Sequence, residues 1–396
     1  MKNHQFLQGG KIILLFSLIF TSIAMHSCKE NNNNHYKINF DVSKWDNKQT
    51  VPYKLIKSIK FIPLETRKDN LLGKVNKTIT TNNRIYVLDM RYSKKIFAFN
   101  KEGKYLNSIG NRGKGPGEYL SINDFIVDEK RSTLQILDSE LRKILIYDAI
   151  SGKFLKEFKL NFWATEFAMP SNNTLLFFSK DQPSKVGTKY SIARLNTENM
   201  NYDWFLKKDE YDRLLSSEFS IFQSQNIYYT SYLNDVVYQL TENEIRPFAT
   251  FNFGTQKIPS DKLKKIAFND IQSLIKLLHE ENWSYNIDNF LDNDELITFD
   301  FTLEGRRVFV IYSKLSSNYY YGHRFEGPLS KLRVIKNIAT DNKRFLGVID
   351  ADVFRNLKNE IMEKGDASLK IHYQQVLNSV TKDSNPIIIS LEYYNF

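Results

Sequence analysis

The chain has 396 residues, is 42% hydrophobic and contains a single cysteine. One cysteine excludes an internal disulfide framework, so stability must come from buried core area, for which the chain is long enough. The formal charge is +10. No helix-turn-helix, ribonucleoprotein or zinc-finger pattern accompanies that charge, so it indicates a lysine-rich solvated surface, and we expect no nucleic-acid partner.

The N-terminus has the pattern of an export signal. Two isolated lysines, Lys2 and Lys11, precede an uncharged apolar stretch from Ile12 to Met25. At 14 residues this stretch is shorter than the roughly 20 that span a bilayer as a helix, which favours a cleaved leader over a transmembrane anchor. We therefore expect residues 1–27 to be a signal peptide.

The leader ends at the only cysteine. Ala24 to Cys28 resembles the lipobox of bacterial lipoproteins, in which a small residue precedes a cysteine that is lipidated on sulfur. A polar, asparagine-rich stretch follows, and we expect residues 28–50 to form a flexible tether. Cys28 would then anchor the protein in the outer membrane, facing the periplasm or the cell surface.

A repeat begins after residue 80. Strand-like residues ending at Asp89, and a turn at Gly103, recur at Asp138 and Gly152, with a spacing of 49 residues in both cases. Each copy predicts strand, turn, strand, glycine turn and strand. A small antiparallel sheet cannot bury both of its faces alone, so such units must stack around an axis as the blades of a propeller.

Fainter copies follow along the chain. Each combines two short apolar runs separated by turn residues, as in the first two copies. They bring the expected number of blades to six, and their runs are 174–178 with 190–195, 226–229 with 235–240, 295–299 with 307–312, and 345–349. The predicted fold class is therefore all-β, a six-bladed β-propeller over residues 51–396.

Two passages interrupt the strands with helical patterns. Apolar residues between 260 and 282 share one helical stripe, and Pro259 with Ser260 predicts its start. The passage 352–380 is divided by Gly365, which predicts two helices. A last strand at 385–391 lies far from the start of its blade, so we expect it to close the ring by pairing with Ile56 to Pro63.

These patterns resemble a known family. The segment 61–66, the first blade with its glycine-rich segment 110–119, and the closing 385–387 are similar to the six-bladed β-propeller lipoproteins of Bacteroidota, relatives of the NHL-repeat propellers. The resemblance covers most of the chain from about residue 51 and is strongest from 59 to 160. It implies the fold and the location, and it carries no catalytic residue to this chain.

The glycine-rich segment from Gly110 to Tyr119 is the first candidate site. A phosphate-binding loop requires Gly-Lys followed by Ser or Thr at a helix start, whereas Lys114 precedes Gly-Pro-Gly and a predicted strand. This favours an inter-blade turn that needs positive φ angles. If the segment binds a ligand, Arg112, Lys114 and Glu118 are the groups expected to do so.

The second candidate is the run Tyr319, Tyr320 and Tyr321. Aromatic rings stack on sugars, although in propellers most aromatics pack between blades. Consecutive strand residues point to opposite faces, so these three tyrosines cannot all be buried. They are therefore the aromatic residues most suited to binding a ligand.

Neither the repeated aspartates nor the scattered histidines predict a metal site. Asp89, Asp138 and Asp350 follow strands, where Asx turns explain them without a cation. The four histidines beyond the leader lie far apart, and there is no His-Glu-x-x-His or Gly-x-Ser-x-Gly motif. We expect no metal and no cofactor.

Without a catalytic motif, two functions stay open. The favoured one is a non-enzymatic, membrane-anchored lipoprotein that acts as a binding or scaffold module for a protein or glycan partner. The alternative is a propeller hydrolase or lyase acting on a polysaccharide, because catalytic residues gathered from several blades leave no sequence motif. A deep axial pocket with several carboxylates, a histidine and a tyrosine would favour the enzyme.

Overall fold

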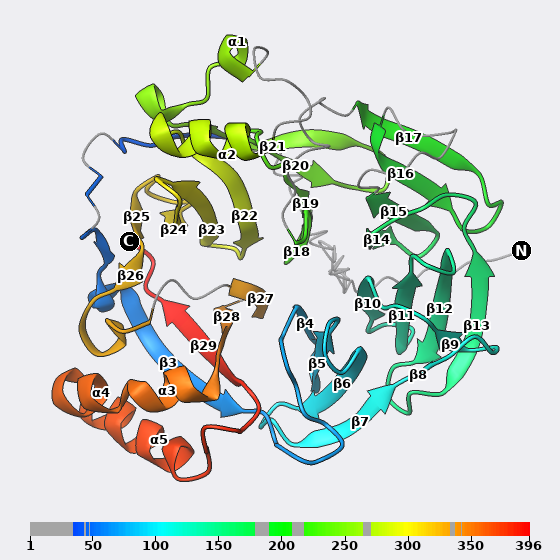
Figure 1. Ribbon diagram of the computed structural model, residues 1–396, viewed down its shortest axis with the longest axis horizontal. Coiled ribbons are helices and arrows are strands. Elements are labelled where there is room, and N and C mark those ends of the chain that lie inside the picture. The colour runs from blue at the N-terminus through cyan, green and yellow to red at the C-terminus, as the bar shows by residue number, and fades with distance from the viewer. Residues whose placement is uncertain are drawn as a thin grey trace, which may run out of the picture. The chain divides into compact units, whose positions relative to one another are not determined.

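The computed structural model describes residues 35–42, 45–46, 48–178, 190–207, 218–263, 271–332, 337–341 and 343–396. Six sheets, five of four strands and one of five, surround one axis as the blades of a propeller (Figure 1). The innermost strands contact one another in a closed ring in chain order, and the last of them contacts the first. The predicted six-bladed propeller is confirmed.

The first three blades take their strands in chain order from inside to outside. Blade 1 consists of β4 (Lys77–Thr80), β5 (Arg84–Asp89), β6 (Lys95–Asn100) and β7 (Tyr105–Ile109). Blade 2 consists of β10 (Asp124–Asp128), β11 (Thr133–Asp138), β12 (Lys143–Asp148) and β13 (Phe154–Lys159). Blade 3 consists of β14 (Glu166–Ser171), β15 (Thr174–Phe178), β16 (Tyr190–Asn196) and β17 (Tyr202–Lys207).

Of the last three blades, blades 4 and 6 include strands from the N-terminal part of the chain. Blade 4 consists of β18 (Ile221–Gln223), β19 (Ile227–Tyr229), β20 (Val236–Leu240) and β21 (Ile245–Asn252), with β1 (Tyr36–Asn39) added in parallel to β21. Blade 5 consists of β22 (Tyr285–Asp292), β23 (Leu296–Leu303), β24 (Arg306–Ser313) and β25 (Tyr319–Gly322). Blade 6 consists of β27 (Asn337–Asp341), β28 (Arg344–Ile349), β29 (Ile387–Tyr393) and β3 (Ile56–Pro63).

Ring closure follows the prediction. β3, from the N-terminal side, pairs antiparallel with β29, from the C-terminal end, in the register Ile387 to Pro63 through Tyr393 to Ile56. The two ends of the propeller domain therefore share one sheet, which removes an edge that would otherwise have no partner.

The segment that leads to β3 is more ordered than the sequence suggested. Residues 28–50 are expected to be a flexible tether, yet β1 is part of blade 4, and Phe40 and Val42 are buried in the same apolar cluster. Polar composition hid these apolar side chains, which alternate with polar ones from Ile38 onward. The tether prediction is wrong for these residues, and 28–34 lie outside the described part of the chain.

The helices occupy the two predicted insertions. α1 (Ser260–Leu263) and α2 (Ile271–Glu280) connect blades 4 and 5, and α1 begins at the predicted Ser260. Three helices, rather than the expected two, separate β28 from β29: α3 (Ala351–Asn356), α4 (Lys358–Lys364) and α5 (Ala367–Leu377). Gly365 ends α4 as predicted, and the additional break lies at Leu357. No described helix is long and apolar enough to cross a membrane.

Short elements complete the chain. Two small parallel sheets pair β2 (Thr50–Val51) with β26 (Arg324–Phe325) and β8 (Asn111–Arg112) with β9 (Glu118–Tyr119). Single 3-10 turns are η1 (Tyr53–Leu55), η3 (Gly254–Gln256) and η4 (Gly327–Leu329).

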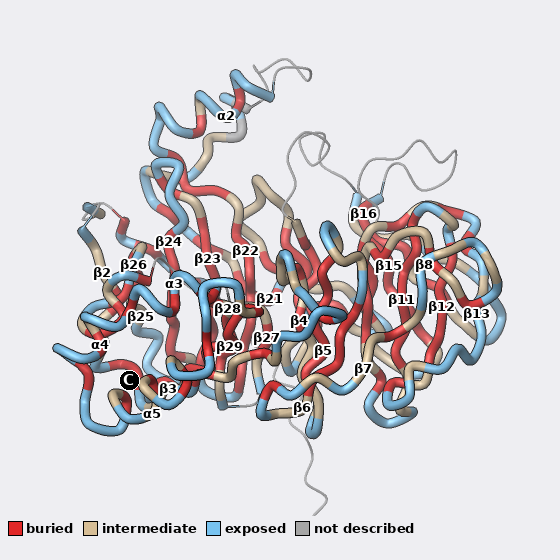
Figure 2. The backbone as a smooth tube through the Cα atoms, turned by 60° about the horizontal axis from the view of Figure 1, so that its bottom comes forward, coloured by how far each residue is buried: buried red, intermediate tan, exposed pale blue. Residues whose placement is uncertain are grey.

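Blades stack by presenting apolar residues on both faces. On β12, Leu145 and Tyr147 pack into the cluster shared with blade 1, whereas Ile144 and Ile146 pack into the cluster shared with blade 3. This is the two-residue alternation of a strand, applied to a sheet that is buried on both sides. Figure 2 shows the result, with buried strands in the interior of the blades and exposed turns at their ends.

Candidate functional site

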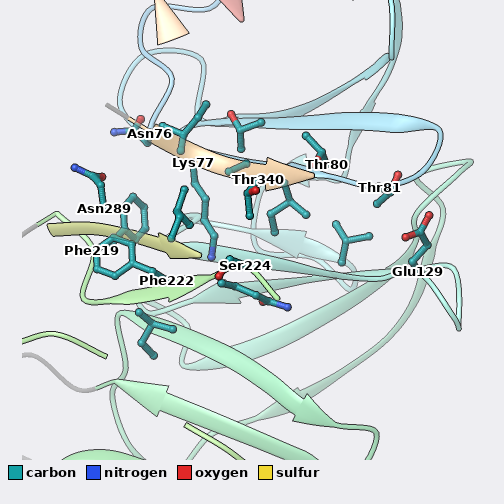
Figure 3. A pocket seen from close by; sticks show the side chains of 18 residues that line it. Asn76, Lys77, Thr80, Thr81, Glu129, Phe219, Phe222, Ser224, Asn289 and Thr340 are labelled. Atoms are coloured by element: carbon teal, nitrogen blue, oxygen red, sulfur yellow. The ribbon is translucent and has the colours of Figure 1, made fainter. Parts of the chain in front are cut away.

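A cavity of about 240 Å³ lies on the propeller axis (Figure 3). Innermost strands β4, β18, β22 and β27 supply most of its lining, and blade 2 adds Val127 and Glu129. Phe219, Phe222 and Asn289 lie on one side of the close-up, and Thr80, Thr81 and Glu129 lie on the other. The cavity therefore runs along the axis, and its two ends carry different side chains.

The open edges of the innermost strands add backbone groups to this cavity. Thr81 donates its N–H to the carbonyl of Arg84 on the neighbouring side of the hairpin. Because hydrogen bonding alternates along an antiparallel pair, the N–H and C=O of the preceding Thr80 point away from β5, toward the axis. The same argument places the backbone groups of Gln223 toward the axis from blade 4.

One end of the axis is crossed by contacts between opposite blades. The Lys74 ammonium lies 3.1 Å from the Glu218 carboxylate, and Asn76 donates to that carboxylate at 2.6 Å. Glu218 directly precedes the entry into blade 4, whereas Lys74 and Asn76 precede β4 of blade 1. This cross-axis bridge (Lys74, Asn76 and Glu218) spans the axis where the cavity is lined by Phe219.

Beside the bridge, charged side chains link neighbouring blades. Lys77 of blade 1 contacts Asp124 of blade 2 at 2.6 Å, and Asp124 accepts the Phe167 N–H of blade 3 at 2.9 Å. Glu166 of blade 3 accepts the Ser220 and Ile221 N–H groups that lead into blade 4. We call Lys77, Asp124 and Glu166 the axial girdle.

Lys77 and Asp124 of the girdle offset each other's charge. Asp124 is 1% exposed, and its burial raises its pKa, while the Lys77 ammonium opposes that rise. The same ammonium lies 5.8 Å from the ring centres of Phe125 and Phe219. Lys77 is thus held by a carboxylate and two aromatic faces, so it is not a free cation for an anionic ligand.

Asn289 has an unusual backbone for a strand residue. Its φ is 50°, in the left-handed region, and the register of β22 shifts on both sides of Asp288. This bulge places Asn289 in the cavity wall, with 2% of its surface exposed. Bulges and left-handed residues are enriched where a strand must re-aim a side chain at a functional site.

The glycine-rich segment lies elsewhere. β8 and β9 form the connection between blades 1 and 2, and Phe154 of the outer strand β13 packs against Gly117. Gly110 and Gly117 have φ of 68° and 70°, which confirms the predicted turn with positive φ angles. Figure 1 shows β8 and β9 beside β13, away from the innermost strands.

Within this turn the three candidate residues have separate roles. Glu118 accepts the Gly115 N–H at 2.9 Å, and the Arg112 side chain reaches the Leu120 carbonyl at 3.4 Å. Lys114 is exposed. None of the three lines the axial cavity, so ligand binding by this segment stays a prediction for a second, outer surface.

The three tyrosines pack against the ends of the chain. The Tyr319 hydroxyl accepts the Asp41 N–H at 3.0 Å, and the ring of Tyr319 lies 4.6 Å from that of Phe40. Tyr320, on the other face of β25, packs against Phe396 at 4.9 Å, whereas the Tyr321 hydroxyl donates to the Asp41 carbonyl. They face opposite sides as predicted, and the contacts place them outside the axial cavity.

The repeated aspartates cap turns. Asp89 accepts N–H bonds from Gly73, Arg91, Tyr92 and Ser93, and Asp138 accepts them from Leu120 and Leu141. Asp350 precedes α3 without capping it. In the part of the chain that the structure describes, no group of three or more His, Cys, Asp or Glu side chains could hold a metal.

Sequence patterns missed the axial residues. The recognised repeat consists of the second and third strands of each blade, whereas the cavity is lined by first strands such as β18 and β22. A signal was available, because the innermost strand must directly precede the recognised pair. Counting back from Asn226 and Glu295 would have pointed to Gln223 and Asn289.

Together, the closed ring and its axial cavity define a six-bladed β-propeller. A family model described as "Domain of unknown function (DUF4934)" matches residues 35–392, so the chain belongs to that family. No curated protein matches the chain.

Two solved structures from Bacteroides are similar over almost their whole length. A "Putative exported protein" from Bacteroides fragilis NCTC 9343 is 20% identical, with a TM-score of 0.72 over 91% of this chain and 99% of its own. A member of the DUF4221 family from Bacteroides vulgatus ATCC 8482 is 8% identical, with a TM-score of 0.50 over 86% and 97%. At these identities the likeness shows the shared fold, as the family resemblance implied, and function must be argued from the site.

Proposed function

We propose that this protein is an exported lipoprotein that binds a ligand in its axial cavity without transforming it. The observation that carries the proposal is the cavity lining: amide, hydroxyl and aromatic side chains beside a cation that is already paired. Such a mixture of an apolar wall with a few polar groups is typical of recognition sites.

Catalysis receives little support from the same lining. Among the described residues that line the cavity, Glu129 is the one carboxylate, and it already accepts the Asn82 N–H at 2.8 Å. Histidine and tyrosine are absent from this described lining. Hydrolysis or lyase chemistry needs a paired acid and base, so the observations favour binding over the polysaccharide-degrading alternative.

Export and anchoring rest on the sequence. The leader 1–27 and Cys28 lie outside the described residues, and membrane attachment through Cys28 completes the proposal. Replacing Cys28 with Ala should move the protein from the membrane fraction to the soluble fraction of cells. Unchanged membrane retention would contradict the lipid anchor while leaving the binding site intact.

Ligand binding is tested by blocking the cavity. The melting temperature of the full chain is measured with panels of neutral sugars, acidic sugars, amino acids and short peptides. A ligand at 100 times its Kd should stabilise the protein by about 2.7 kcal/mol. Gln223→Trp places an indole in the cavity from an exposed position, so it should abolish that stabilisation.

The matched control is Lys114→Trp, which adds the same side chain at the glycine-rich turn. It should respond to ligand as the wild type does. Stabilisation lost in Lys114→Trp and kept in Gln223→Trp would move the site to the outer turn. Stabilisation by no ligand class would contradict the proposed function.

A further inference from the structure

Polar groups without partners converge on the axial cavity. Thr78 lines the cavity and is 2% exposed. Its buried hydroxyl has no hydrogen-bond partner among the described residues. Buried polar groups in folded proteins are nearly always satisfied, so this part of the cavity wall keeps hydrogen-bonding capacity that the described side chains leave unused. The cavity is thus built to receive hydrogen-bonding groups.

The second such group is the side-chain oxygen of Asn289. The amide of Asn289 donates from Nδ2 to Oδ2 of Asp300, and a carboxylate only accepts, so the amide orientation is fixed. Oδ1 receives no hydrogen bond from the part of the chain that is described, and it is the acceptor that remains for the cavity. Figure 3 shows Asn289 at the cavity edge near Phe219.

Asp300 is itself held in place. The Arg307 guanidinium lies 3.6 Å from Asp300 and 3.7 Å from Asp288, the residue directly before Asn289. Asp300 is 1% exposed, and Asn289 and Asp300 lie on adjacent strands of blade 5. Arg307 and Asp300 therefore act as positioning residues for the Asn289 amide.

The size and charge of the cavity restrict the class of ligand that it can bind. At about 240 Å³ it is smaller than the roughly 300–1,000 Å³ of pockets for drug-sized ligands, which limits it to a compact molecule. Lys77 is paired with Asp124, and Glu129 contributes negative charge, so nothing in the described lining attracts an anion. Phe219 and Phe222 provide apolar walls.

We infer that the axial cavity binds one neutral sugar ring, with Asn289 Oδ1 accepting a hydrogen bond from a sugar hydroxyl. This assignment rests on the proposed function and names its ligand class. Because Oδ1 is an acceptor, the hydroxyl at that point must be a donor. A methyl ether at that position cannot donate and loses the bond, so O-methylation of that single hydroxyl should weaken binding about ten-fold.

The test is calorimetric titration of the full chain. The probes are D-glucose, D-galactose, D-mannose and N-acetyl-D-glucosamine, with D-glucuronate and D-galacturonate as acidic counterparts, and the mono-O-methyl ethers of whichever neutral sugar binds. A neutral sugar should bind at least about ten-fold more tightly than its uronate, as expected for one unfavourable charge contact of about 1.4 kcal/mol. Tighter binding of a uronate overturns the assignment.

Two glycine variants test the role of Asn289. Asn289 and Asn286 both have positive φ, 50° and 56°, so glycine is compatible with either backbone. Asn289→Gly removes the proposed acceptor and should weaken sugar binding about ten-fold or more, since the loss of one buried hydrogen bond costs about 1.5 kcal/mol. Asn286 does not line the cavity, and Asn286→Gly should bind as the wild type does.

Asp300→Asn tests the positioning separately. An asparagine at 300 can donate to Oδ1 of Asn289, which lets the Asn289 amide reverse and present Nδ2 to the cavity. The variant should therefore bind the methyl ether more tightly than the wild type does. A purely structural role would weaken all sugars equally, and that result would overturn the positioning role.

The outcomes separate the two proposals. Sugar binding that survives Asn289→Gly contradicts the assignment of Asn289 and leaves the binding function standing. Binding of another ligand class that is lost in Gln223→Trp contradicts the sugar ligand alone. Binding of nothing in any panel contradicts the proposed function itself.

Discussion

The first and second halves of the propeller cover their outer strands differently. In blade 2 the outer strand β13 is mostly exposed, with 53% of Leu155 accessible. In blade 4 the corresponding β21 carries β1, and in blade 6 the strand β3 packs against α5. Segments from the N-terminal part of the chain and from the helical insertion thus cover the second half.

This difference explains where the repeat is visible. In blades 1 and 2 the outer strands β7 and β13 carry no added strand in the described sheets, and the same residues recur with a spacing of 49. In blades 4 to 6 each outer strand also meets an additional segment, such as Phe40 on blade 5, and its side chains pack against that segment.

Replacing Phe40 with Ala removes a side chain that packs the N-terminal segment onto the second half of the propeller. Phe40 is 3% exposed, and its ring contacts those of Phe253, Phe299 and Tyr319. Its loss should lower the free energy of unfolding by about 3–5 kcal/mol, as for other buried phenylalanines. Leu155→Ala on the exposed β13 is the control and should change stability by less than about 0.5 kcal/mol. Urea denaturation measures the loss of unfolding free energy in both variants. Equal losses would contradict the proposed difference between the two halves.

Replacing Lys77 with Met tests the junction of the first two blades. It leaves Asp124 buried without its counter-ion, and the free energy of unfolding should fall by about 3 kcal/mol. Because the cost comes from the unpaired charge, the double variant Lys77→Met with Asp124→Asn should recover part of the loss. Chemical denaturation of the three proteins measures this, and additive losses would show that the girdle holds the blades by packing alone.

The sequence predicted those features that depend on repetition and alternation. The number of blades, the helical insertions and closure between Ile56–Pro63 and the last strand all follow from apolar runs, which must be buried wherever they occur. The break at Leu357 escaped prediction because the residue is apolar and lies inside a helical pattern. β1 was not predicted because it has few apolar residues. They become buried only when the fold brings β21 beside them.

The candidate site was less predictable, and the reason is physical. Innermost strands have one edge on the axis, so their sequences mix polar and apolar residues without a clear period, as in Ile221–Gln223. Sequence patterns drew attention instead to Lys114 and to Tyr319, where glycines and aromatic runs are conspicuous for reasons of turn geometry and packing. Which polar groups meet on the axis depends on the closed ring, and the ring is a property of all six blades.

Asp89 of blade 1 and Asp138 of blade 2 occupy equivalent positions in the repeat. Replacing each one tests whether equivalent positions contribute equally to the free energy of unfolding. Burial alone would raise the pKa of Asp89, but the four N–H donors outweigh it and lower the pKa below 3.8. Asp89→Asn should cost about 1–2 kcal/mol, and Asp138→Asn should cost slightly less because it has fewer N–H partners. Urea denaturation at neutral pH measures both losses.

Acid denaturation distinguishes the charge of Asp89 from its shape. A carboxylate with a lowered folded pKa stabilises the protein above the unfolded value of 3.8, and this contribution is lost as the pH falls through the folded pKa. The difference between wild type and Asp89→Asn should therefore shrink at low pH. A difference that is independent of pH would assign the effect to hydrogen-bond geometry alone.

The smallest expected effect concerns the covered edge of blade 6. His372 on α5 accepts the Phe61 N–H from β3 at 2.9 Å, so Nε2 must be unprotonated for the helix to hold the strand. Burial, followed by the nearby Lys60, lowers the pKa of His372 below 6.5. The unfolded chain then binds the proton first, so stability is complete above pH 6.5 and falls as the pH drops from 6.5 toward the folded pKa. His372→Gln keeps an acceptor that does not titrate, and its melting temperature should depend less on pH between 7.5 and 5 than that of the wild type. An unchanged dependence would show that Phe354 of α3 and Tyr373 of α5 cover β3 by packing on Phe61, without a contribution from the histidine.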